Sequence, residues 1–180
     1  TTFPAATILG YPRIGRNREL KKALEAHWAG RTSVEELLKA EAELRQANLA
    51  RLVELGLRAQ DASLPENSSL YDQVLDVTSL LGAVPARFEG RRGLELHFAL
   101  ARGDQGSAPE EMTKWFDTNY HYLVPEIGPD TEIKLNLEAI DEQLEVAKEH
   151  GVTVRPQLVG PLTLLLGAKA EQGSPEGFTP

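Results

Sequence analysis

Apolar residues recur every three or four positions over several stretches of the chain, and this spacing predicts amphipathic helices. The spacing from Leu20 to Trp28 predicts a helix that starts at Arg18, with Asn17 as its N-cap. A longer helix is predicted over residues 33–55, and its first four residues, SVEE, have the form of a capping box. Further helices are expected over residues 71–81, 94–101 and 137–151, and a helix or turn over 162–170.

Shorter apolar and β-branched runs alternate with these helices and predict strands. The runs cover residues 6–9, 57–64, 111–116, 121–125 and 152–159, and a turn is expected over 65–69. Strands that alternate with helices are typical of a parallel sheet covered by helices, so the chain is predicted to be α/β. A closed (β/α)₈ barrel has eight strands and needs roughly 200 residues or more. A count of about four strands therefore predicts half a barrel or a small open α/β unit.

Composition narrows the class of protein. The 180 residues are 41% hydrophobic, carry a net charge of −8 and include no cysteine. Disulfides and thiolate metal sites are therefore excluded within this chain. No apolar run is long enough to cross a membrane and the N-terminus lacks a signal pattern, so a soluble, cytoplasmic protein is expected. The acidic balance argues against a nucleic-acid-binding protein, which would show an extended basic face and steeply salt-dependent association.

Basic residues gather around the start of the first predicted helix. Five of the chain's 19 basic residues lie there: Arg13, Arg16, Arg18, Lys21 and Lys22. Cations at a helix N-terminus oppose the helix dipole by some tenths of a kcal/mol each, so folding stability alone does not favour this arrangement. A bound anion among the side chains and the first-turn N–H groups would relieve the repulsion. Alternatively, these side chains extend into solvent or pair with Glu19 and Glu25.

Several segments resemble a known family. The block over residues 111–126, EMTKWFDTNYHYLVPE, combines polar and aromatic positions in an uncommon order. Together with GYPRIG at 10–15, RELKKA at 18–23 and VGPLT at 159–163, it resembles the N-terminal region of cobalamin-independent methionine synthase. The resemblance covers about residues 5 to 170 of the chain.

The resemblance implies a fold and an activity. The implied fold is an incomplete (β/α)₈ TIM barrel over residues 1–172, the N-terminal barrel portion of a two-barrel enzyme. The polar segment over 173–180, which contains Gly and Pro, is expected from its composition to be a flexible tail. The implied activity is transfer of a methyl group from 5-methyltetrahydropteroyltriglutamate, a folate polyglutamate, to homocysteine. In the family, zinc and homocysteine are held by the C-terminal barrel and no cobalamin is used. The 180-residue chain alone is expected to be inactive.

The resemblance also implies which residues bind the folate polyglutamate. Asn17, Arg18, Glu19 and Leu20 occupy the family's folate-contacting segment, Lys21 follows on the same helix face as Asn17, and Lys114 would supply another cation. Arg18 could hold a carboxylate through two hydrogen bonds, whereas the lysines act as point charges. Glu19 is expected to orient Arg18 or to accept from the ligand, and Leu20 to contribute its N–H group and core packing.

Other interpretations stay open at this point. The chain could be a non-catalytic structural or anion-binding module that braces a partner domain. His121 could be a ligand or a structural histidine, and Trp115 could stack on a pterin or pack in the core. Asp72 and Asp76 resemble a carboxylate pair, although a capping or surface role is favoured for them.

Overall fold

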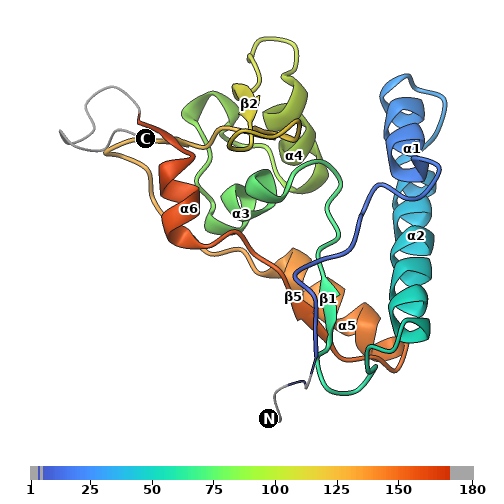
Figure 1. Ribbon diagram of the computed structural model, residues 1–180. Coiled ribbons are helices and arrows are strands. Elements are labelled where there is room, and N and C mark those ends of the chain that lie inside the picture. The colour runs from blue at the N-terminus through green and yellow to red at the C-terminus, as the bar shows by residue number, and fades with distance from the viewer. Residues whose placement is uncertain (1–3, 5, 171–180) are drawn as a thin grey trace. The chain divides into compact units, whose positions relative to one another are not determined.

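The computed structural model describes Pro4 and residues 6–170, which form two compact units (Figure 1). Unit 1 contains the described residues up to Leu70 together with Ile140–Gln157, and unit 2 contains Tyr71–Ala139 together with the described residues from Leu158. The expected tail over 173–180 lies outside the described residues. Each unit has its own apolar core, so each is described on its own.

Unit 1 is built on three helices, the third in most of its length, and a pair of parallel strands. Its elements are α1 (Glu19–Trp28), α2 (Val34–Glu54), β1 (Leu64–Glu66), most of α5 (Glu138–Glu149) and β5 (Val154–Pro156). β1 and β5 are parallel, with Leu64 opposite Val154. These two residues and Leu52 are buried with Ala147 in one cluster, so α2 and α5 are held to the strand pair by apolar packing.

The start of α2 confirms the predicted capping box. The Ser33 N–H donates to the Glu36 carboxylate at 2.8 Å, and the Glu36 N–H donates to the Ser33 hydroxyl at 3.2 Å. Two N–H groups that a helix start leaves without partners are thereby satisfied. α1 packs along α2 through Leu20 and Leu24, which are 1% and 5% exposed.

Unit 2 combines three α-helices with two further strand pairs. Its elements are α3 (Gln73–Leu81), a 3₁₀ turn η1 (Ala86–Phe88), α4 (Gly93–Arg102), β2 (Met112–Lys114), β3 (His121–Leu123), β4 (Glu126–Ile127), α6 (Pro161–Leu166) and β6 (Lys169–Ala170). β2 and β3 form an antiparallel hairpin, and β4 pairs with β6 in parallel. Phe88, Leu75 and Leu100 are fully buried at the centre of one core cluster.

The α/β class is confirmed, but the predicted single parallel sheet is not seen. The strands of the described residues form three separate two-stranded sheets, one of them antiparallel. Residues 6–9 form no strand, and hydrogen bonds from a side chain hold part of the segment instead. Arg155 donates to the Thr7 hydroxyl at 2.7 Å and to the Ile8 carbonyl at 2.8 Å.

The strand predicted over residues 57–64 is also wrong in its position. Ala62 has a left-handed φ of 58°, which interrupts an extended chain, and β1 begins only at Leu64. Pro65, expected in a turn, lies inside the strand. The missing N–H of a proline is tolerated there because β1 pairs with a single neighbour among the described strands. Within the described part of the chain, no helix has the length and apolar character needed to cross a bilayer.

Candidate functional site

The basic segment before α1 is anchored to the segment after β1. The Tyr11 N–H donates to the Asn67 side-chain oxygen at 3.0 Å, and the Asn67 amide group donates to the Tyr11 carbonyl at 2.9 Å. A Cβ atom on Gly10 would lie 3.2 Å from Cγ of Asn67, so glycine permits this close approach. Asn48 of α2 adds a hydrogen bond to the Pro12 carbonyl at 3.3 Å.

The turn into α1 depends on Gly15 and Glu19. Gly15 has a φ of +88°, and a Cβ atom there would lie 2.1 Å from a carboxylate oxygen of Glu19. That carboxylate accepts hydrogen bonds from the Asn17 N–H at 2.9 Å and from the Asn17 side-chain amide at 3.1 Å. Backbone hydrogen bonding, first at its own N–H and then at Asn17, lowers the pKa of Glu19. Glu19 therefore closes the turn as a carboxylate.

The predicted N-cap is wrong by one residue. Arg18, not Asn17, precedes the first helical residue, and its backbone is left-handed with a φ of 63°. Such a conformation is costly for a residue with a side chain. It arises here because the Glu19 carboxylate draws the chain back onto Asn17, and the Arg18 N–H donates to Gly15 at 3.1 Å.

The first-turn N–H groups are largely engaged, contrary to the expectation that they are open to an anion. The Leu20 N–H donates to the Ile14 carbonyl at 3.1 Å, and the Lys22 N–H donates to Arg18 at 3.0 Å. The N–H groups of Asn17 and Arg18 are bonded to the Glu19 carboxylate and to the Gly15 carbonyl. An anion at this helix start would therefore be bound chiefly by side chains. Leu20 is in the core as expected, but its N–H group is already bonded.

The basic side chains differ in how they are paired. Arg13 donates to the Ser69 carbonyl at 2.9 Å, and Lys21 pairs with Glu25 at 3.6 Å, which matches the alternative interpretation for that lysine. In contrast, Arg16, Arg18 and Lys22 are exposed and form no ion pair with any residue that the structure describes. Three exposed basic side chains thus lie at the start of α1 without a described ion pair, although the charge of Lys22 acts on Glu19.

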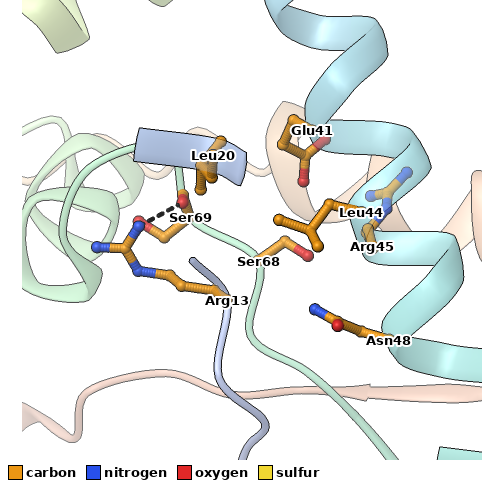
Figure 2. A pocket seen from close by; sticks show the side chains of 8 residues that line it. All are labelled: Arg13, Leu20, Glu41, Leu44, Arg45, Asn48, Ser68 and Ser69. Carbon is orange, nitrogen blue, oxygen red and sulfur yellow. Dashed lines mark hydrogen bonds between the residues drawn. The ribbon is translucent and has the colours of Figure 1, made fainter. Parts of the chain in front are cut away.

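A small pocket lies beneath this segment (Figure 2), lined by Arg13, Leu20, Glu41, Leu44, Arg45, Asn48, Ser68 and Ser69. The Glu41 side chain extends from α2 toward Ser68. Burial raises the pKa of Glu41, the carboxylates of Glu66 and Glu142 add to the rise, and Arg45 and Ser68 oppose it. The Ser69 hydroxyl is buried without a hydrogen-bond partner among the described residues.

Lys114, the remaining predicted site residue, belongs to unit 2. It is exposed on β2 opposite His121 of β3. Trp115, the next residue, makes edge-to-face contacts with Tyr122 at 5.4 Å and Phe116 at 5.0 Å between ring centroids. These contacts favour the packing role for Trp115. His121 is exposed and its Nδ1 atom lies 3.1 Å from the Asn119 carbonyl.

The structure therefore brings five of the six predicted residues together in one turn and helix start, Asn17 to Lys21, and places Lys114 in the other unit. Sequence reasoning missed Asn48 and Asn67, the residues that hold the basic segment in place. No local pattern identifies them, because they lie 36 and 56 residues from their partners along the chain. Between Pro4 and Ala170, as far as the structure describes the chain, no group of three or more His, Asp or Glu residues could hold a metal ion.

Asp72 is a second polar residue with several partners. It caps α3 by accepting from the N–H groups of Val74 and Leu75, both at 3.1 Å, and it also accepts from the Leu123 N–H at 2.9 Å. Asp72 is 2% exposed. The capping role favoured for it is confirmed.

Comparisons with known proteins agree on one family. A family model described as "Cobalamin-independent synthase, N-terminal domain" matches residues 5–179. The chain is 50% identical over 178 residues to a protein of Streptomyces coelicolor, covering 97% of this chain and 23% of that protein. It is 46% identical over 179 residues to a protein of Kali turgidum, with the same coverage of 97% and 23%.

A protein of Mycobacterium tuberculosis is 50% identical over 171 residues, which is 94% of this chain and 22% of that protein. All three relatives are named 5-methyltetrahydropteroyltriglutamate–homocysteine methyltransferase. The chain thus spans less than a quarter of their length. The match over nearly all of its residues shows that the chain belongs to the family of the cobalamin-independent synthase N-terminal domain.

Proposed function

We propose that this chain is the N-terminal part of a methyltransferase that moves a methyl group from 5-methyltetrahydropteroyltriglutamate to homocysteine, forming methionine. We further propose that the start of α1 binds the glutamate tail of the folate. The names of the relatives support the reaction. The observation that carries the binding role is the group of exposed side chains of Arg16, Arg18 and Lys22, which form no ion pair with a described residue, in a chain of net charge −8.

The charge of the tail fits this region. A triglutamate tail carries several carboxylates, and the start of α1 presents several exposed cations on adjacent residues. Each exposed cation contributes little alone, because surface ion pairs are worth about 0–1 kcal/mol. A ligand with several carboxylates can engage several cations at once, so the preference for a long tail over a short one follows from the number of pairs.

The residues of the site take different parts in this proposal. Arg18 grips a carboxylate through its planar guanidinium group, and Lys114, which the family resemblance implies as a site residue, acts as a mobile point charge. Lys21 contributes after exchanging its partner Glu25, with which it forms a weak and exposed pair at 3.6 Å. Asn17 and Glu19 hold the turn, and Leu20 fixes α1 to the core.

The wider assignment follows from the family. We propose that the two parallel strand pairs belong to an incomplete (β/α)₈ TIM barrel, and that the whole protein is a cytoplasmic enzyme that does not use cobalamin. Zinc, as implied by the family, would activate the homocysteine thiol as a thiolate. Its ligands are assigned to the part of the protein that this chain does not span, since the chain has no cysteine and the described residues offer no cluster of ligands.

The binding role is tested by Arg18→Ala and Lys114→Ala in the full-length protein. Affinity for the triglutamate substrate should fall by about three- to tenfold in each variant, with a much smaller change for the monoglutamate, and added salt should narrow the gap. Lys39→Ala is the matched control, because Lys39 is an exposed cation of α2 that pairs with Glu43 away from this turn. Equal losses for both ligands would contradict tail binding and favour a bracing role.

A further inference from the structure

Glu110 is a buried acidic side chain in unit 2 that the proposed function does not use. It is 3% exposed, and both of its carboxyl oxygens lack a hydrogen-bond partner among the residues that the structure describes. Buried charges in proteins are normally paired or hydrogen-bonded, because removing them from water is costly. The unpartnered carboxyl of Glu110 therefore favours the neutral form.

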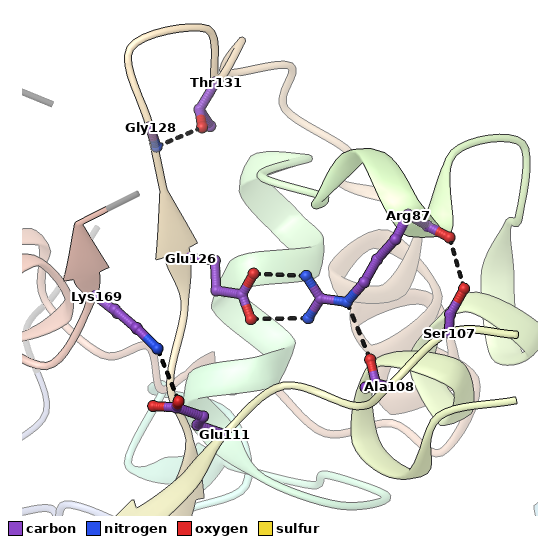
Figure 3. Close-up of polar contacts among 8 residues, drawn as sticks. All are labelled: Arg87, Ser107, Ala108, Glu111, Glu126, Gly128, Thr131 and Lys169. Atoms are coloured by element: carbon purple, nitrogen blue, oxygen red, sulfur yellow. Dashed lines mark hydrogen bonds and ion pairs between the residues drawn. The ribbon is translucent and has the colours of Figure 1, made fainter. Parts of the chain in front are cut away.

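Arg87 is the basic residue whose charge acts on Glu110, and its side chain already has hydrogen-bond partners. Both amino groups of the Arg87 guanidinium donate to the Glu126 carboxylate, at 2.6 and 2.7 Å, and the third nitrogen donates to the Ala108 carbonyl at 3.0 Å (Figure 3). Arg87 thereby joins η1 to β4 and to the segment that leads to Glu110. All three nitrogens of its guanidinium are engaged in this arrangement.

The other charges around Glu110 are negative. Glu126 on β4 and Asp72 at the start of α3 both interact electrostatically with the Glu110 carboxyl, as does Arg87 on η1. Burial is the largest cause that raises the pKa of Glu110, the carboxylates of Glu126 and Asp72 add to the rise, and Arg87 opposes it, so that the pKa is about 8. Farther out, Lys169 of β6 pairs with Glu111 at 2.7 Å. The positive charge of Arg102 of α4 opposes the rise that burial causes in the pKa of Tyr71.

The backbone places Glu110 where several elements meet. Its N–H donates to the Leu100 carbonyl at the end of α4 at 3.0 Å. The backbone carbonyl of the next residue, Glu111, accepts from the Val124 N–H at 2.8 Å, and β2 begins at Met112. A change in the charge of Glu110 therefore acts on the base of the β2–β3 hairpin.

We propose that Glu110 is a proton-sensitive switch for this hairpin. Neutral Glu110 leaves Arg87 paired with Glu126, and the ionised side chain competes with Glu126 for Arg87 and loosens the packing of the segment over 104–127. The step is a simple ionisation: the O–H bond of the carboxyl breaks and the proton passes to solvent. Since Lys114 lies on the same hairpin, the switch would also change tail binding if the proposed function holds.

Hydrogen exchange in the full-length protein tests the switch without reference to activity. Exchange of peptides within residues 104–127, corrected for the intrinsic effect of pH, should rise at least several-fold between about pH 7 and pH 9 in the natural sequence. Glu110→Gln, which keeps the shape of the neutral side chain, should abolish this rise. Glu111→Gln is the matched control, because Glu111 is an exposed neighbour, and it should retain the rise.

A second measurement observes the proton itself. The infrared difference between the natural protein and Glu110→Gln should contain the carbonyl band of a protonated carboxylic acid at about pH 7, and this band should be lost at about pH 9. The proposal would be overturned if the natural protein and Glu110→Gln showed the same pH dependence of hydrogen exchange. It would also be overturned if Glu110 were ionised at neutral pH. Neither result depends on folate binding, so the test is separate from that of the proposed function.

Discussion

The carboxylate of Asp72 accepts a hydrogen bond from the backbone N–H of Leu123 at 2.9 Å, across 51 residues of sequence. The same carboxylate caps α3 through Val74 and Leu75. One buried side chain therefore fixes the first turn of a helix and the last residue of β3, and with β3 the hairpin that carries Lys114.

Asp72→Ala should destabilise unit 2 by about 2–4 kcal/mol. The loss of a helix cap costs about 1 kcal/mol, and a buried N–H left without a partner adds about 1–3 kcal/mol. Hydrogen exchange of the α3 and β3 amides measures the effect of Asp72→Ala, and hydrogen exchange of the α2 amides measures the effect of Ser33→Ala. Ser33→Ala provides the comparison, since Ser33 is an exposed cap without a second role, and it should cost about 1 kcal/mol. Similar costs for the two variants would contradict the bridging role of Asp72.

Gly15→Ala should disrupt the turn into α1. Its φ of +88° is unfavourable for alanine, and the new Cβ atom would collide with the Glu19 carboxylate. Gly30 is the matched control, because its φ is also positive, at +68°, but nothing lies within 4 Å of a Cβ atom there. Gly30→Ala should cost about 1 kcal/mol from backbone strain, and Gly15→Ala should cost more. Urea unfolding compares the stability of the two variants, and equal losses would show that the Glu19 side chain moves aside at no cost in free energy.

The paired hydrogen bonds between Arg87 and Glu126 should give a measurable coupling energy. The two side chains are 31% and 17% exposed, so solvent screens the pair less than at the surface. A double-mutant cycle with Arg87→Met and Glu126→Gln should yield about 1–2 kcal/mol. The pair of Lys148 and Glu145, 77% and 67% exposed, should yield less than about 0.5 kcal/mol in the same experiment. A coupling near zero for the first pair would contradict its structural role.

The stability of the folded protein should fall with rising pH through the action of Glu110. Its pKa rises from 4.5 to about 8 on folding, so between these values the folded state keeps a proton that the unfolded state releases. The contribution is complete below about pH 4.5 and is lost as pH rises to about 8, by at most about 1.4 kcal/mol per pH unit. Urea unfolding across this range should show a flatter profile for Glu110→Gln than for Glu111→Gln. Parallel profiles would show that Glu110 is ionised in the folded protein.

Local signals in the sequence predicted the helices well. The capping box at Ser33, the cap at Asp72 and the stop at Gly82 all act within four residues of the helix they delimit, and α2 and α3 have close to the expected bounds. The segment around Lys114 was also expected as a strand, because it contains Thr113, Trp115 and Phe116, whose residue types favour strands.

Long-range contacts could not be predicted in the same way. The segment over 6–9 has the composition of a strand, yet Arg155, which lies 147 residues from Ile8, takes the place of a neighbouring strand. At the candidate site, the residue types predicted a cluster of cations, but only the structure places Glu19 against Asn17 and Lys21 against Glu25. A single sequence cannot show which carboxylate pairs with which base when several lie within one helical turn.

The folded-back carboxylate of Glu19 has a consequence for selectivity. The turn before α1 already contains one negative charge of its own, which partly offsets the field of the neighbouring cations that a monoanion would meet. An oligoanion brings more negative charge than Glu19 provides and can satisfy the neighbouring cations together. Under the proposed binding role, the internal carboxylate would favour ligands with several carboxylates over monoanions such as chloride or a single free amino acid.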